Sequence, residues 1–415
     1  MASAEAMKYE ESKIMLKYQT WYAFVWISTI VLYGVGLSSF NTELCFPLDV
    51  FFFITIIAAV FLAKVATNVP LQRIEYVRER EPIGTVLISL GFLTDWAYQR
   101  KIPMLYPYQG FEVGVSENEV VGIPVLHVVL IGCAIYWGMY LGYLFICNPM
   151  KKQYLVELCV LIGLFIANLS RGYIVFMLFV PLLCYAAFHS HGVTKTKVST
   201  IVAVFLCGLS IVFFISIMGN MRYGYSWHDC SFIERIGRYL NYPWWLSKHF
   251  MWFYSYVTSP LANLNLNATM PPNPLDIKGY VFSFLPGVFG YTSGSTTIHY
   301  ITSYFNAVTG FTTFLRSGGL TGLYFAIAVI FVYYSLVRYF LRRCKALDTF
   351  GNAVLCLLIV GFVFYNSLRT AALCYLPIIL IIHSFYMSKQ VASGRVVVYP
   401  YQENDSYRRT EVNGR

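Results

Sequence analysis

Charged residues are scarce in this chain, and their scarcity excludes a soluble globular fold. Asp, Glu, Lys and Arg make up 12% of the 415 residues, whereas 58% are hydrophobic and the mean hydropathy is +0.59. A single soluble core cannot bury that much apolar surface. The sequence therefore predicts an all-α polytopic membrane protein.

Signals typical of several other classes are also missing. The first twenty residues are polar and charged, so we expect no cleavable signal peptide and a first helix that stays as an anchor. Neither a zinc pattern nor a nucleic-acid patch is visible, and lysines and arginines beside anionic headgroups explain the net charge of +10. We expect no metal, no cofactor and no nucleic-acid partner. Inverted repeats and Gly/Pro-broken helix pairs, which mark many transporters, are not found.

Cysteines are few outside the predicted helices. Of the ten cysteines, only Cys45 and Cys230 fall in predicted loops. These two could pair, but two candidates define no disulfide framework. The others are expected to be small apolar residues buried within helices.

Apolar stretches long enough to cross a bilayer recur along the chain, and we count about ten transmembrane helices. They are residues 21–38, 48–65, 84–98, 123–146, 154–167, 173–188, 198–218, 320–339, 354–365 and 371–386.

Positive charge predicts the orientation of these helices. Most of the 30 lysines and arginines fall in the amino-terminal segment, the tail and every second connection, so both termini are predicted to be cytoplasmic. This orientation depends on the short segment 84–98, which contains Asp95. If that segment does not cross the membrane, every later connection lies on the opposite side. The predicted organisation is a membrane domain over 1–218, a large external loop over 219–319, a membrane domain over 320–388 and a mobile cytoplasmic tail over 389–415.

The large external loop is the most informative region. It interrupts the apolar helices with a stretch rich in Trp and Tyr that carries Arg222, Arg235, Arg238 and Arg316. A transporter seldom needs such a loop. An enzyme at the membrane surface does, because soluble sugars or phosphates must be held outside the hydrocarbon while their lipid tails stay within it.

Four stretches carry a resemblance to a known family. They are Gly-Ile-Pro-Val-Leu-His at 122–127, Ser-Arg-Gly at 170–172, Tyr-Val-Thr-Ser-Pro-Leu-Ala-Asn at 256–263, and Phe-Asn-Ala-Val-Thr at 305–309 followed by Gly-Gly-Leu-Thr-Gly at 318–322. In order and placement they resemble the Wzy-type O-antigen and capsule polymerases of bacteria. One position departs from the family, which commonly shows an Asp-Phe-Gly type sequence where this chain has Arg316-Ser317-Gly318.

The resemblance implies a fold, a reaction and a place in the cell. It implies a metal-independent glycosyltransferase, similar to the GT-C type, in the bacterial inner membrane. Such an enzyme transfers a growing glycan from undecaprenyl pyrophosphate to a fresh lipid-linked repeat unit on the outer face, with a chain-length regulator (co-polymerase) as a further partner. An O-antigen ligase uses the same donor and stays open as an alternative. A flippase or transporter is a second, although it would need more polar residues within the helices.

Arg171 is the first candidate for holding the diphosphate. It lies between two predicted helices at the outer headgroup level, where a guanidinium can bind phosphate with two hydrogen bonds. An arginine that only anchors the interface is the alternative. Arg369, in a similar predicted hairpin, has the same two interpretations.

Charged residues of the large loop supply further candidates. Glu234, Arg235 and Arg238 fit one short helix, in which Glu234 and Arg238 can pair at a spacing of four residues. Arg316 precedes two glycines at a predicted helix start, where backbone amides favour anions. A simple turn before a membrane helix is the alternative for those glycines.

Histidines and tryptophans complete the candidate site. His299 and Glu234 are candidate bases, and His127 is either a hydrogen-bonded structural residue or a base in contact with substrate. Trp244 and Trp245 either stack on sugar rings or belong to the aromatic belt of the membrane interface.

The predicted topology can be tested by labelling introduced cysteines in a cysteine-free background. A membrane-impermeant thiol reagent added from outside should modify cysteines placed in the 219–319 loop. It should not modify cysteines placed near Arg342 or Lys389, because those segments are predicted to be cytoplasmic. External labelling near Arg342 would contradict the placement of the whole candidate site.

Overall fold

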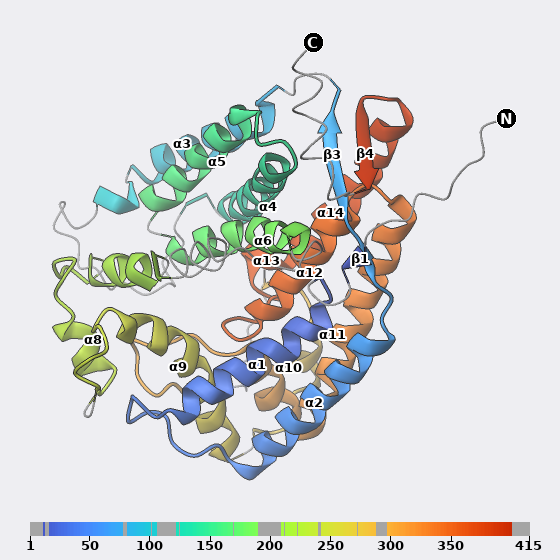
Figure 1. Ribbon diagram of the computed structural model, residues 1–415. Helices are drawn as coiled ribbons and strands as arrows, with labels where there is room; N and C mark the ends of the chain where they lie inside the picture. The colour runs from blue at the N-terminus through green and yellow to red at the C-terminus, as the bar shows by residue number, and fades with distance from the viewer. Residues whose placement is uncertain are drawn as a thin grey trace.

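Helices dominate the computed structural model (Figure 1). The structure describes residues 11–12, 16–77, 81–100, 102–105, 122–123, 125–168, 170–189, 209–210, 212–221, 223–239, 242–271, 273–287 and 297–400.

A helix is found in the described part of each stretch predicted to span the membrane, with some shifts in its ends. These helices are α1 (Tyr18–Gly34), α2 (Phe46–Val65), α3 (Ile83–Gln99), α4 (Leu126–Cys147), α5 (Lys152–Ala167), α6 (Arg171–His189), a helix over Val212–Met221, α11 (Gly310–Cys344), α12 (Asp348–Gly361), α13 (Ala371–Cys374) and α14 (Leu376–Ala392).

Within the described residues, four stretches of helix are long and apolar enough to cross a membrane: α2, α4, α11 and Ala372–Ala392. On α2 the side chains of Phe53, Phe61 and Val65 remain 68%, 64% and 67% exposed. Such a row of large apolar side chains suits contact with lipid and not with water. A mostly helical protein with apolar helices of membrane-spanning length is therefore shown, and ten crossings stay a prediction.

Among the described residues, two short antiparallel strand pairs join segments near the chain ends to the connection between α2 and α3. Strand β1 (Glu11–Ser12) pairs with β2 (Val69–Pro70), and β3 (Gln72–Tyr76) pairs with β4 (Val396–Pro400), near both termini in Figure 1. The fold is thus not purely α-helical. The prediction of a mobile tail from residue 389 is wrong up to residue 400, because the run of valines before Tyr399 favours a strand.

Segments predicted to be cytoplasmic meet at one end of the helices. Lys17 donates through Nζ to the carbonyl oxygens of Ala63 and Ala66, each at 2.8 Å. Arg342 donates through Nη2 to the carbonyl oxygen of Asn68 at 2.9 Å. Carbonyl groups at the end of a helix lack helical partners and carry partial negative charge. Lys17 and Arg342 therefore stabilise the end of α2 by both hydrogen bonding and charge. The segments therefore share one side, as the charge pattern predicts.

Helix α11 differs most from its predicted bounds. It begins at Gly310, ten residues before the predicted start, and Gly319 breaks it with φ 65° and ψ −166°. Only glycine adopts such a backbone conformation readily. Gly318 and Gly319 therefore lie at a kink that divides α11 into two helical segments, and the second segment starts after Gly319, where the sequence predicts the membrane helix. Arg316 belongs to the segment before the kink.

The predicted external loop is folded. It contains α8 (Ser231–Ile236), α9 (Phe250–Thr269), α10 (Ile277–Phe282) and the first turns of α11. We call its described residues between 223 and 309 the cap, and in Figure 1 α8 and α9 lie far from both termini. A second apolar core holds the cap together: Phe40, Cys230, Phe232, Ile233, Ile236, Tyr239, Met251, Trp252, Tyr254 and Phe305.

Cys45 and Cys230 are both free thiols in the structure, so the pairing considered for them is not formed. Cys230 is buried in the second core, where it packs as a small apolar residue.

Candidate functional site

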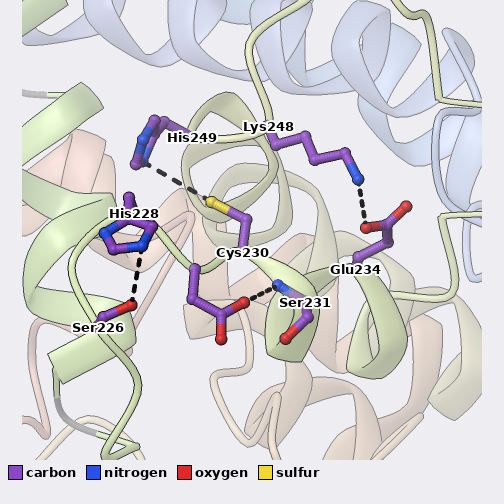
Figure 2. A pocket seen from close by; sticks show the side chains of 8 residues that line it. Ser226, His228, Cys230, Ser231, Glu234, Lys248 and His249 are labelled. Carbon is purple, nitrogen blue, oxygen red and sulfur yellow. Dashed lines mark hydrogen bonds and ion pairs between the residues drawn. The ribbon is translucent and has the colours of Figure 1, made fainter.

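A polar pocket opens in the cap beside α8 (Figure 2). Its volume is about 410 Å³, which lies within the usual range of small-molecule sites. The lining residues are Ser226, His228, Asp229, Cys230, Ser231, Glu234, Lys248 and His249.

Local hydrogen bonds explain how the chain builds one wall of this pocket. Oδ1 of Asp229 accepts the backbone N–H of Ser231 at 2.9 Å, which closes a turn directly before α8. A hydrogen bond from the Ser231 side chain, together with this backbone bond, holds the pKa of Asp229 below its ordinary value. Asp229 is therefore a carboxylate at neutral pH.

A salt bridge forms the other wall. Nζ of Lys248 lies 2.7 Å from Oε2 of Glu234, so the segment before α9 is tied to α8. Figure 2 shows this pair facing His228 and Ser226 across the pocket. Together, the two walls carry the carboxylates of Asp229 and Glu234 and the ammonium group of Lys248. The pocket therefore does not attract phosphate.

The third group of interest is His249, directly before α9. Its Nδ1 lies 2.7 Å from the hydroxyl of Ser216 and 3.8 Å from Sγ of Cys230. Burial, with a smaller effect from His228, lowers the pKa of His249, so its imidazole is neutral at pH 7. Burial also raises the pKa of the Cys230 thiol, which excludes an activated thiolate nucleophile despite the nearby imidazole.

The pocket suits an uncharged, hydroxyl-rich ligand. Hydroxyls of Ser226 and Ser231, the carboxylates and the imidazoles together offer both donors and acceptors, as sugar hydroxyls require. Trp227 is exposed and its ring lies 5.3 Å from that of His228. An exposed aromatic ring beside hydroxyl-binding groups can pack against a sugar ring.

Candidates on α8 have partners other than those predicted. Glu234 lines the pocket and pairs with Lys248, so the predicted pairing of Glu234 with Arg238 is wrong. Arg238 follows α8 with φ 48° and places its guanidinium 5.0 Å from the ring centre of Phe40. Arg235 donates to the hydroxyl of Tyr225 at 3.5 Å. The fourth loop candidate, Arg222, falls outside the described residues.

Arg316 is held by the protein. The side chain is 5% exposed. Its Nε donates to the carbonyl of Thr297 at 3.0 Å, Nη1 to that of Pro271 at 2.9 Å and Nη2 to Oδ1 of Asn273 at 2.5 Å. A further bond joins Nη1 to the carbonyl of Asn267 at 3.4 Å. The guanidinium thus binds carbonyl oxygens of the cap, so Arg316 positions those segments of the cap relative to α11.

Asparagines on α9 hold the chain on either side of that helix. Asn263 binds the carbonyls of Phe305 and Ala307, each at 2.8 Å, and Asn267 binds the backbone of His299 at 2.7 and 3.0 Å. Asn265 lies on another face of α9 and accepts the N–H of Cys45 at 2.9 Å. The candidate base His299 is thereby fixed in place through its backbone.

The remaining candidates lie at helix ends and on the surface. Trp244 and Trp245 are 95% and 70% exposed, and neither lines the pocket. Arg369 donates through Nη1 to the carbonyl of Phe282 at 3.5 Å. Arg171 is the first residue of α6, and its side chain is outside the described set. His127 pairs with Asp95 at the facing ends of α4 and α3.

Among the acidic, basic and imidazole groups of the pocket, the sequence analysis identifies only Glu234 as a candidate and misses His228, Asp229, Lys248 and His249. Asp229 had a usable signal, because an Asp two residues before the start of a short helix is typical of a capping turn. Lys248 had none, since its partner is fourteen residues away. Within the described part of the chain, no three His, Cys, Asp or Glu side chains gather in a metal-binding arrangement.

Comparisons with family models, with curated proteins and with solved structures gave no match to this chain.

Replacing Arg316 by Lys should lower the stability of the protein. Lysine cannot reach three separate carbonyl groups at once, and losing one charge-assisted hydrogen bond costs about 1.5–3 kcal/mol. Thermal unfolding of the purified protein in detergent would measure the change. Arg343→Lys, on the exposed face of the same helix, is the matched control and should change stability by less than about 0.5 kcal/mol. Equal stability of Arg316→Lys and wild type would contradict the positioning role.

Proposed function

We propose that this protein is a membrane glycosyltransferase that polymerises oligosaccharide repeat units carried on a lipid diphosphate, the lipid being undecaprenyl, at the outer face of the bacterial inner membrane. The observation that carries the proposal is the pocket of about 410 Å³ in a folded cap next to membrane-type helices. A soluble sugar attached to a lipid needs such a site, because its two parts prefer different solvents.

The two parts of the substrate fit different regions of the protein. The cap pocket offers hydroxyl-binding groups and no excess of positive charge, which suits a neutral sugar. The diphosphate needs cations, and Arg171 at the first turn of α6 and Arg369 beside α13 are placed at helix ends. A helix start adds backbone N–H groups that favour anions. In this arrangement the sugar lies in the cap pocket and the lipid tail lies between the membrane helices.

The reaction requires little beyond this arrangement. A hydroxyl of one lipid-linked unit attacks the anomeric carbon of the other, and the lipid diphosphate departs with the bonding electrons. Negative charge grows on the departing diphosphate, so arginines aimed at it stabilise the transition state. The same proposal includes a co-polymerase that controls the length of the polymer and that binds this protein at the surface of the cap.

Deleting the gene in its source strain tests the function directly. Loss of a polymerase should leave surface lipid capped with a single repeat unit. Loss of a ligase should instead leave uncapped surface lipid and accumulate lipid-linked polymer, and loss of a flippase should trap single units inside. Gel separation of surface glycans together with extraction of lipid-linked glycans distinguishes the three results. Long surface chains in the deletion strain would rule out the polymerase.

The deletion strain also tests the pocket. His228→Ala removes an exposed lining side chain without a buried contact, so folding should be preserved. We expect shorter surface chains, because a weaker glycan site releases the growing polymer earlier. An unchanged length distribution would exclude the pocket as the glycan site.

Arg171→Lys should lower polymerisation strongly at normal protein level. Lysine keeps the charge but loses the planar pair of donors that matches phosphate. Loss of a charge-assisted contact of about 1.5–3 kcal/mol lowers turnover roughly tenfold to a hundredfold, and Arg171→Ala should abolish nearly all of it. Polymer length and amount in the complemented deletion strain are the readout. Arg408→Ala in the tail is the control, and normal long chains from Arg171→Ala would make Arg171 an interface anchor.

A further inference from the structure

A carboxylate and an imidazole lie against each other where α3 ends and α4 begins. Nδ1 of His127 is 2.6 Å from Oδ2 of Asp95. Gln99 donates to the same oxygen at 3.1 Å, and the backbone N–H of Ile123 donates to Oδ1 at 2.8 Å. Gln99 and Ile123 donate N–H groups, and an ionised carboxylate only accepts, so Nδ1 of His127 is assigned as the third donor to Asp95.

The backbone around this pair is shaped to bring the two side chains together. Gly122 has φ +100°, and a Cβ added there would lie 2.4 Å from Oδ1 of Asp95 and 2.8 Å from Nδ1 of His127. Val125, three residues on, has φ 66°, which is costly for a β-branched residue. Strained conformations of this kind persist where the surroundings enforce them and gather at functional sites.

The exposure of the two side chains differs in a useful way. The Asp95 side chain is 0% exposed and that of His127 is 16% exposed. Because Asp95 accepts the proton on Nδ1, the other ring nitrogen of His127, Nε2, carries the lone pair. Nε2 makes no hydrogen bond within the described residues. The ring nitrogen Nε2 is therefore the one not used in binding the buried carboxylate of Asp95.

A hydrogen bond connects this pair to the segment that leads into Arg171. Trp96, next to Asp95 in α3, donates through Nε1 to Oδ1 of Asn168 at 3.1 Å. Asn168 ends α5, and α6 starts three residues later at Arg171. The Asp95–His127 pair and the candidate phosphate-binding arginine thus lie at the same end of the helices, which is the end predicted to face outward.

We propose that His127 is the general base of the transfer and that Asp95 positions it; this rests on the function proposed above. The acceptor hydroxyl oxygen forms the new bond to the anomeric carbon while its proton passes to Nε2 of His127. The bond from that carbon to the lipid diphosphate breaks, and the diphosphate leaves with the electron pair. Asp95 holds the imidazole in the required tautomer and stabilises the imidazolium that forms.

The alternative is that His127 only holds α3 and α4 together through its hydrogen bond to Asp95. The His127→Asn variant distinguishes this structural role from the role of general base. The Asn amide nitrogen can take the place of Nδ1 and keep the bond to Asp95, but it cannot accept a proton. Membranes from the deletion strain carrying each variant, with their own lipid-linked units as substrate, give the rate of polymer formation. We expect His127→Asn to lose about a hundredfold or more, since general base catalysis contributes roughly 10²–10⁴. Asp95→Asn should lose at least about tenfold.

Rescue by a small molecule supplies the second readout. His127→Ala leaves a space the size of an imidazole, so added imidazole should restore part of its rate, and should not do so for Arg171→Ala. Wild-type rates in His127→Asn, or the absence of imidazole rescue in an otherwise stable His127→Ala protein, would overturn the base. Either of these outcomes would overturn the role of His127 as base without contradicting the proposed polymerase function. Long chains in the deletion strain would instead overturn the function and the base together.

Discussion

A guanidinium surrounded by carbonyl oxygens holds the cap onto the helices. Arg316, in the first turns of α11, donates to the backbone of the cap at two points, Thr297 and Pro271. Those carbonyls belong to irregular segments and would otherwise lack helical or sheet partners. Because Arg316 lies just before the kink at Gly319, the position of the cap and the path of α11 depend on each other.

The polar groups of the protein fall into sets with different chemistry. The cap pocket has two carboxylates against one ammonium and a neutral imidazole, so it favours hydroxyls over phosphate. Arg171 and Arg369 stand at helix ends, where anions are favoured or tolerated. The Asp95–His127 pair contributes a group able to take a proton. A transfer between lipid-linked sugars needs a site that binds hydroxyls, a site that binds the diphosphate and a group that accepts a proton. Because the arginines lie away from the carboxylates of the pocket, those carboxylates do not neutralise them.

Two charged residues have partners that their local sequence does not predict, for one physical reason. The glycines after Arg316 suggest a phosphate ligand, and a spacing of four residues suggests that Glu234 pairs with Arg238. Both arguments use only neighbours in sequence. Arg316 instead finds partners 19 and 45 residues away, and Glu234 finds Lys248 fourteen residues away. A buried guanidinium takes the carbonyls that tertiary packing brings to it, and local spacing does not reveal which these are.

The sequence by itself determined the class of the protein and the places of its helices. Hydropathy is a local property, so an apolar stretch of sufficient length indicates a membrane helix wherever it packs. Only the tertiary structure decided which polar groups meet. Asp95 joins His127 across a segment of 32 residues, and the strand at Val396–Pro400 closes against Gln72–Tyr76 from the other end of the chain. Such contacts are selected by the free energy of the whole packed chain, since each buried donor and acceptor must find a partner somewhere in it.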